Sequence, residues 1–174
     1  MAIILGIDPG SRITGYGLVK TQPNHHHQFI ACGCIRLEKY SLGDKLKTIH
    51  EVIADLVHTY QPDETAIEQI FFHENPSTAL KLGQARGAAI AASALYGLTV
   101  HEYTARQVKK AVVGYGAADK SQIQHMIQIL LKLEMIPPVD AADALAIALC
   151  HAYTREGLKS LGGVAQKMRY RRLR

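Results

Sequence analysis

The sequence predicts an α/β domain built around a mixed sheet. Three β-rich runs come first in the chain, and segments of helical periodicity separate two later β-rich runs from them and from each other. This order of elements is typical of a sheet with helices packed on its faces. A length of 174 residues is enough for one compact domain with its own core.

The five predicted strands are short runs bounded by turn residues. Residues 2–8 are apolar and end at an Asp-Pro-Gly turn, and residues 14–20 alternate as the second arm of a hairpin would. Residues 64–69 follow a turn, which predicts a buried strand returning beside the first. Residues 29–37 and 99–102 supply the other two strands.

Helical spacing of apolar residues begins after Ser41, which with Asp44 resembles a capping box. This helix is expected to end near Tyr60. Asn75 and Pro76 are a good cap and first residue for the next helix. The remaining predicted helices cover residues 105–113, 120–133 and 139–153.

The chain is expected to divide into a compact domain, residues 1–155, and a basic tail, residues 156–174. From Arg155 onward the chain has seven basic residues, one acidic residue and a Gly-Gly pair. This composition predicts a mobile tail. The tail either solubilises the protein or adds phosphate contacts.

Charge and composition restrict the class of partner. A formal net charge of +5 favours a polyanion, because Lys and Arg side chains release counterions from phosphates. The sequence contains no recognisable signal peptide or membrane-spanning run, which predicts a soluble protein. Cys32, Cys34 and Cys150 lack CxxC spacing and suit reduced thiols in a cytosol. The adjacent histidines 25–27 are expected on a solvated loop.

Asp8 and Glu68 each end a predicted strand. An open α/β sheet presents its functional groups at such positions. An aspartate before Pro-Gly is also a common turn residue, so Asp8 alone decides little. A carboxylate such as Glu68, at the end of a buried run, needs a partner, a proton or a cation.

Asp140 and Asp143 are three residues apart, which puts both side chains on one face of the predicted helix. Acidic residues in a first turn also interact favourably with the helix dipole. The same face continues to Ile147 and Cys150, so it is expected to point toward the sheet.

Four carboxylates at one sheet edge would repel one another unless cations neutralised them. Hard oxygen ligands select Mg²⁺ or Mn²⁺ over softer metals. Two such ions roughly 4 Å apart can activate a water and stabilise the leaving oxygen of a phosphodiester displacement. This arrangement predicts nuclease chemistry.

Six sequence blocks in order resemble the RuvC family of Holliday junction resolvases, up to about Tyr153. They are GIDPGSRITGYG, AIEQIFF, ALKLGQARG, ARQVKK, DKSQIQ and DAADALAIA. The resemblance implies a ribonuclease H-like fold with a five-stranded mixed sheet. It also implies a cytoplasmic bacterial homodimer that nicks two opposing strands of four-way junction DNA and works with RuvA and RuvB.

The resemblance also implies roles for particular residues. The metal ligands would be Asp8, Glu68, Asp140 and Asp143, holding two Mg²⁺ per active site, with Mn²⁺ as a substitute. Lys120 would lie close to the scissile phosphate and serve catalysis. Lys109 would grip the DNA backbone, Phe71 would stack on an unpaired base, and Arg106 is a further candidate DNA contact.

The predicted helix after Pro76 carries small residues at every fourth position, which are Ala79, Gly83, Gly87 and Ala91. Such a stripe allows close approach either of a second subunit or of the protein's own sheet. Two other function classes stay open. One is a junction-binding protein without catalysis, and the other is an actin-like or sugar-kinase ATPase fragment. The segment DPGSRITGYG also resembles the phosphate-binding hairpin of that ATPase superfamily.

Overall fold

A computed structural model describes residues 1–22, 26–70 and 76–171, with side chains described as far as residue 158. Its elements, in chain order, are β1 (Ile3–Asp8), β2 (Ile13–Lys20), β3 (Gln28–Arg36), α1 (Leu42–Tyr60), β4 (Glu64–Glu68), α2 (Pro76–Leu95), β5 (Thr99–Tyr103), α3 (Ala105–Val113), α4 (Lys120–Leu130) and α5 (Val139–Arg171).

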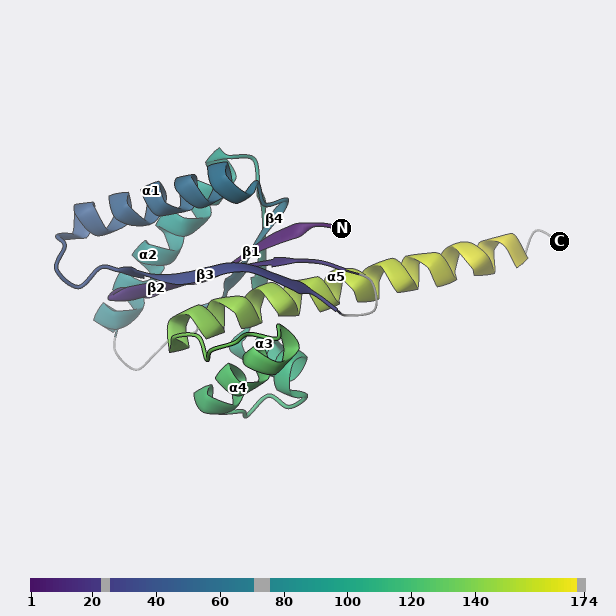
Figure 1. Ribbon diagram of the computed structural model, residues 1–174. Helices are drawn as coiled ribbons and strands as arrows, with labels where there is room; N and C mark the ends of the chain where they lie inside the picture. The colour runs from purple at the N-terminus through teal and green to yellow at the C-terminus, as the bar shows by residue number, and fades with distance from the viewer. Residues whose placement is uncertain (23–25, 71–75, 172–174) are drawn as a thin grey trace.

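The five strands form one mixed sheet in the order β3-β2-β1-β4-β5. The first three strands pair antiparallel, and β4 and β5 run parallel to β1. Helices α1 and α2 cover one face of this sheet, and α3, α4 and α5 cover the other (Figure 1). The predicted α/β class, the mixed sheet and the return of residues 64–69 beside β1 are therefore confirmed.

Side chains that alternate along the strands divide the core into two layers. In β1, Leu5 and Ile7 pack with the buried side of α1 and α2, whereas Ile4 packs with α5. On β4, Ile67 and Ala66 alternate in the same way. Since successive strand residues face opposite sides, β1 and the centre of β4 are buried on both faces, which is why residues 3–7 of β1 are all apolar.

Three glycines of β1 and β2, which are Gly6, Gly15 and Gly17, let the first half of α5 lie directly on the sheet. A β-carbon on Gly6 would overlap the Ala144 carbonyl oxygen, and one on Gly17 would overlap the Leu145 side chain. The close approach therefore depends on positions without a side chain. It brings the acidic first turn of α5 to the end of β1.

Helix α5 is longer than the sequence predicted. It was expected to end near Tyr153, but its backbone stays helical to Arg171 and extends beyond the sheet (Figure 1). No proline follows Val139, and a glycine costs a helix only about 1 kcal/mol, so the Gly-Gly pair does not end it. The mobility of residues 156–174 and the division at residue 155 stay predictions.

The histidine run differs from its predicted solvated loop. His26 is exposed, but His27 is buried against the Tyr153 ring, and its Nδ1 accepts a hydrogen bond from the Gln22 N–H at 3.3 Å. The third histidine, at position 25, lies outside the described residues. In the part of the chain that the structure describes, no helix is both long and apolar enough to cross a membrane.

Candidate active site

Asp8 is the last residue of β1, where it pairs with Gly15 of β2. The connecting turn is held by Thr14, whose hydroxyl accepts a hydrogen bond from the Gly10 N–H at 3.2 Å and donates one to the Gly10 carbonyl at 3.0 Å. The buried hydroxyl of Thr14 thus fixes the turn that follows Asp8.

Glu68 ends β4, the strand next to β1. Arg86 of α2 fixes this strand end, because its Nε donates to the Glu68 carbonyl oxygen at 3.0 Å. The same guanidinium contacts the Glu102 carboxylate of β5 at 2.5 Å. Arg86 therefore joins the ends of β4 and β5, a role that the sequence analysis missed because both partners come from other elements.

The acidic pair of α5 reaches the same edge. Asp140 and Asp143 are partly buried in the first turns of the helix, and Ile147 and Cys150 of the same face are fully buried. The expectation that this face points inward is confirmed. The Asp140 carbonyl oxygen lies 1.9 Å from the position that a β-carbon of Gly15 would take, which sets the helix directly over the end of β1.

Electrostatics shows that these acids act on one another. The pKa of Asp8 lies well above its usual value. Burial of the carboxyl group is the largest cause, and the negative charges of Asp143 and Glu68 come next. Burial, then the charge of Asp143, also raises the pKa of Glu68, while Lys120 and Lys109 act in the opposite direction. A buried group of like charges favours a cation or a positive side chain at its centre.

Lys120 supplies one positive charge at this group. Its Nζ lies 2.9 Å from Oδ2 of Asp143. Burial lowers the pKa of Lys120, but the hydrogen bond to Asp143 and its charge outweigh that effect and raise it overall. Lys120 is held here because Asp119 caps α4 and starts that helix beside α5.

A cavity of about 360 Å³ opens at the ends of β1 and β4. Its lining residues are Asp8, Pro9, Glu68, Gln69, Ile70, Leu82 and Ala105. Lys109 of α3 is close enough for its charge to affect Glu68. Arg106 is exposed and lies against Gly116, whereas Phe71 lies outside the described residues.

A second set of polar side chains was not anticipated. Among the described residues, only Glu64, His101 and His151 bring three possible metal-ligand atoms within 4.8 Å of one another. Burial lowers the pKa of His151, although its hydrogen bond to Glu64 opposes this. Burial acts to raise the pKa of Glu64, but His151 and Arg155 outweigh it and lower the pKa overall.

Comparison with known proteins gives the family. A sequence model described as "Crossover junction endodeoxyribonuclease RuvC" matches residues 4–151. The chain belongs to the RuvC family. A RuvC of Marinobacter nauticus is 55% identical over 174 residues, which cover 100% of this chain and 99% of that protein. A RuvC of Shewanella amazonensis is 52% identical over 174 residues, covering 100% of each chain.

Solved RuvC structures share the fold. Thermus thermophilus RuvC in complex with Holliday junction substrate matches with a TM-score of 0.84 and 32% identity, covering 90% of this chain and 97% of that one. The yeast mitochondrial Holliday junction resolvase matches with a TM-score of 0.68 and 11% identity, covering 95% of this chain and 85% of that one. The second match supports the fold alone, and together they confirm the ribonuclease H-like fold.

Proposed function

We propose that this chain is a Holliday junction endonuclease that resolves four-way DNA junctions by paired symmetric nicks. The mutual effect of Asp8, Glu68 and Asp143 at one sheet edge, with Lys120 bound to Asp143, carries the proposal. Relatives more than half identical over the whole chain are named crossover junction endodeoxyribonucleases. The positive net charge suits a DNA substrate.

The proposed metal ligands are Asp8, Glu68, Asp140 and Asp143. The donors fit Mg²⁺, since all are carboxylates, and burial followed by the charges of Asp143 and Glu68 raises the pKa of Asp8, a cost that a bound cation would offset. Two Mg²⁺ ions, or Mn²⁺ in their place, would supply water activation and charge stabilisation at the scissile phosphate. Gly15 and Arg86 serve as positioning residues, since they set the approach of α5 and the end of β4.

Lys120 has two roles in this proposal. Without DNA its ammonium pairs with Asp143, which lessens repulsion among the acids. With DNA the same ammonium would lie beside the scissile phosphate, where it offsets charge that develops on the oxygens. Lys109 would hold the adjacent backbone, Phe71 would stack on an unpaired base, and Arg106 would add a further phosphate contact.

Symmetric cleavage requires two active sites related by a two-fold axis, so we infer a homodimer. The small-residue stripe of α2 supports this inference, because Gly83 and Gly87 are exposed and have no neighbouring atoms within 4 Å of a β-carbon position. The buried residues of α2 that pack on the sheet are instead Ala85, Ala89, Ala92 and Ser93. The stripe is therefore available to a second copy.

The proposed setting is the bacterial cytoplasm, where chromosomal junctions arise and where the RuvA and RuvB branch-migration proteins would be partners. The named relatives are bacterial proteins. The metal dependence, the dimer and these partners all belong to the proposal.

The deciding experiment is cleavage of a labelled synthetic four-way junction, with Mg²⁺ or EDTA, beside a linear duplex of the same sequence. We expect paired nicks on the junction alone and only with Mg²⁺. Junction binding without nicks would favour a non-catalytic binding protein. ATP hydrolysis without DNA would favour an actin-like or sugar-kinase activity.

A further inference from the structure

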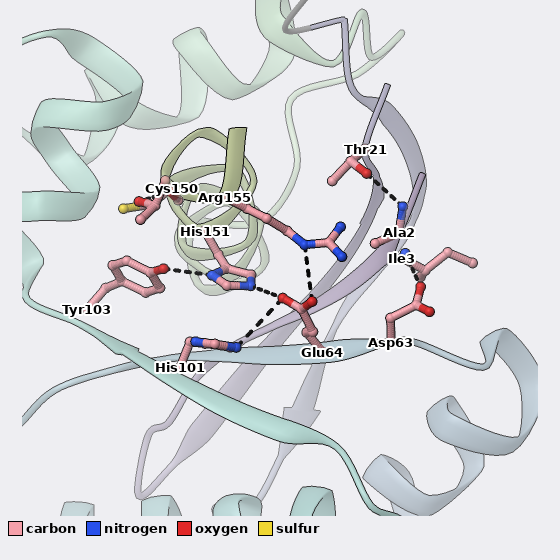
Figure 2. A network of polar contacts seen from close by, with 11 residues as sticks. Ala2, Ile3, Thr21, Asp63, Glu64, His101, Tyr103, Cys150, His151 and Arg155 are labelled. Atoms are coloured by element: carbon pink, nitrogen blue, oxygen red, sulfur yellow. Dashed lines mark hydrogen bonds and ion pairs between the residues drawn. The ribbon is translucent and has the colours of Figure 1, made fainter. Parts of the chain in front are cut away.

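A second group of ligand-type side chains lies between α5 and the β4–β5 edge of the sheet (Figure 2). Glu64 begins β4, His101 lies in β5, and His151 comes from α5. Oε2 of Glu64 is 2.5 Å from Nε2 of His151 and 3.6 Å from Nε2 of His101. The two imidazole rings are stacked with their centroids 4.2 Å apart. All three ligand atoms therefore face one small volume.

We propose that Glu64, His101 and His151 form a binding site for a divalent transition-metal ion of the Zn²⁺ class. Two imidazole nitrogens and one carboxylate oxygen are a donor set that zinc uses in proteins. Hard ions such as Mg²⁺ prefer oxygen ligands and do not suit this set. A water molecule would complete four-coordination on the open side, where the His101 side chain is 38% exposed.

The contacts around the three ligands support a metal site. The ring nitrogen of His151 that would not bind the ion, Nδ1, lies 2.6 Å from the Tyr103 hydroxyl. The other oxygen of Glu64, Oε1, forms an ion pair with Nε of Arg155 at 3.1 Å. Partners of this kind orient metal ligands and fix which histidine nitrogen binds the ion. The contacts of Tyr103 and Arg155 leave Nε2 and Oε2 for the metal (Figure 2).

The contacts of His151 also account for its ring proton both with and without a bound ion. Without metal, a neutral His151 donates from Nε2 to Glu64 and accepts from Tyr103 at Nδ1. When Nε2 binds the ion, the ring proton moves to Nδ1, which then donates to the Tyr103 oxygen. The change needs a tautomer shift and rotation of one hydroxyl. It also needs a small side-chain shift, because two ligands about 2.0 to 2.1 Å from a tetrahedral ion lie about 3.3 Å apart, whereas Oε2 of Glu64 and Nε2 of His151 are now 2.5 Å apart.

This site is distinct from the carboxylates of the candidate active site. Glu64 and Glu68 lie on the same face of β4, but they are four positions apart, which corresponds to about 13 Å along a strand. An ion at Glu64 would join β4 and β5 to α5, the helix that carries Asp140 and Asp143. Its expected effect is to stabilise the docking of α5 on the sheet.

The test measures zinc binding by full-length protein in saturating Mg²⁺, which occupies the carboxylate site. We expect Zn²⁺ to raise the melting temperature, by about 5 to 10 °C at a free concentration one hundred times Kd. We also expect Co²⁺ to give the visible absorption of a four-coordinate complex. His101→Gln and Glu64→Gln should each abolish both signals and remove one equivalent of zinc in a titration.

His125→Gln is the matched control, since His125 is an exposed histidine of α4. It should keep the full zinc response, whereas the two ligand variants keep only binding at other histidines. A wild-type protein without a zinc-dependent shift would overturn the proposal. Full zinc binding retained by either ligand variant would overturn it as well. Circular dichroism without zinc checks that each variant is folded.

Discussion

The carbonyl oxygen of Asp140 occupies the space that a β-carbon on Gly15 would need. Because Gly15 pairs with Asp8 across β1 and β2, this contact fixes the first turn of α5 over the end of β1. The register of one strand pair thus sets the distance between Asp8 and the first turn of α5.

Gly15→Ala should disturb the carboxylates without unfolding the protein. The added methyl group must push the first turn of α5 away, and overpacking of this kind costs about 1 to 3 kcal/mol. We expect junction cleavage to fall at least about tenfold, since a small misplacement of reacting groups is costly. Single-turnover rates measure the effect. Gly43→Ala is the control, because nothing lies within 4 Å of its β-carbon position. A wild-type cleavage rate in the Gly15→Ala variant would contradict the prediction.

Asp8→Asn should abolish cleavage and yet stabilise the protein in EDTA. The raised pKa of Asp8 means that its ionised form opposes folding at neutral pH, so an uncharged amide removes that cost. We expect a gain on the order of 1 kcal/mol, or a few degrees in melting temperature. Mg²⁺ should stabilise the wild type more than the variant.

Calorimetry in EDTA and in Mg²⁺ measures both effects. Asp55→Asn is the matched control, because Asp55 is an exposed residue of α1. It should change neither stability nor cleavage appreciably. A destabilised Asp8→Asn protein that also loses junction binding would assign Asp8 a structural role instead.

Lys120→Ala should lower the cleavage rate by about 100-fold while junction binding remains within a few-fold of wild type. The ammonium lost is the one that contacts Asp143, and removal of a single charge-stabilising donor commonly has this effect. Lys47→Ala removes an exposed lysine paired with Glu51 and serves as control. Comparable losses in binding and cleavage would make Lys120 a simple phosphate contact.

Arg86→Ala should raise the Mg²⁺ concentration needed for half-maximal cleavage. Its guanidinium joins the Glu68 carbonyl to Glu102, so its loss frees the end of β4 and misplaces a proposed ligand. We expect a shift of severalfold, measured by titrating Mg²⁺ at fixed junction concentration. Arg86→Lys keeps one donor and should recover part of the loss. An unchanged Mg²⁺ requirement would show that β4 is held by other contacts.

Phe71→Ala should reduce cleavage of an intact junction more than cleavage of a junction opened beforehand by unpaired bases. Base stacking on an aromatic ring contributes roughly 1 to 3 kcal/mol, so about a tenfold loss is expected on the intact substrate. Parallel assays on the two junctions measure the ratio. Equal losses on both would indicate that Phe71 packs within the protein.

Local sequence patterns predicted most of the fold because periodicity and turn residues are local signals. The apolar run before Asp8 and the helical spacing after Ser41 led to the correct element types and order. The predicted length of α5 was wrong because a glycine pair in the sequence resembles a helix break. A helix ends only where its hydrogen bonding or packing fails. The four carboxylates were predicted as one group because Asp8 and Glu68 end strands and Asp140 and Asp143 share one face of a helix, and their role as metal ligands stays a prediction.

The sequence by itself determined the classes of element, the acidic set and the family. Only the tertiary structure decided which side chains meet, because the order β3-β2-β1-β4-β5 arises from long-range pairing. The Lys120–Asp143 ion pair joins α4 to α5, and the Glu64–His151 contact spans 87 residues. Neither contact has a local sequence signal, because the partners are far apart in the chain. Only the folded sheet and its helices bring them within contact distance in space.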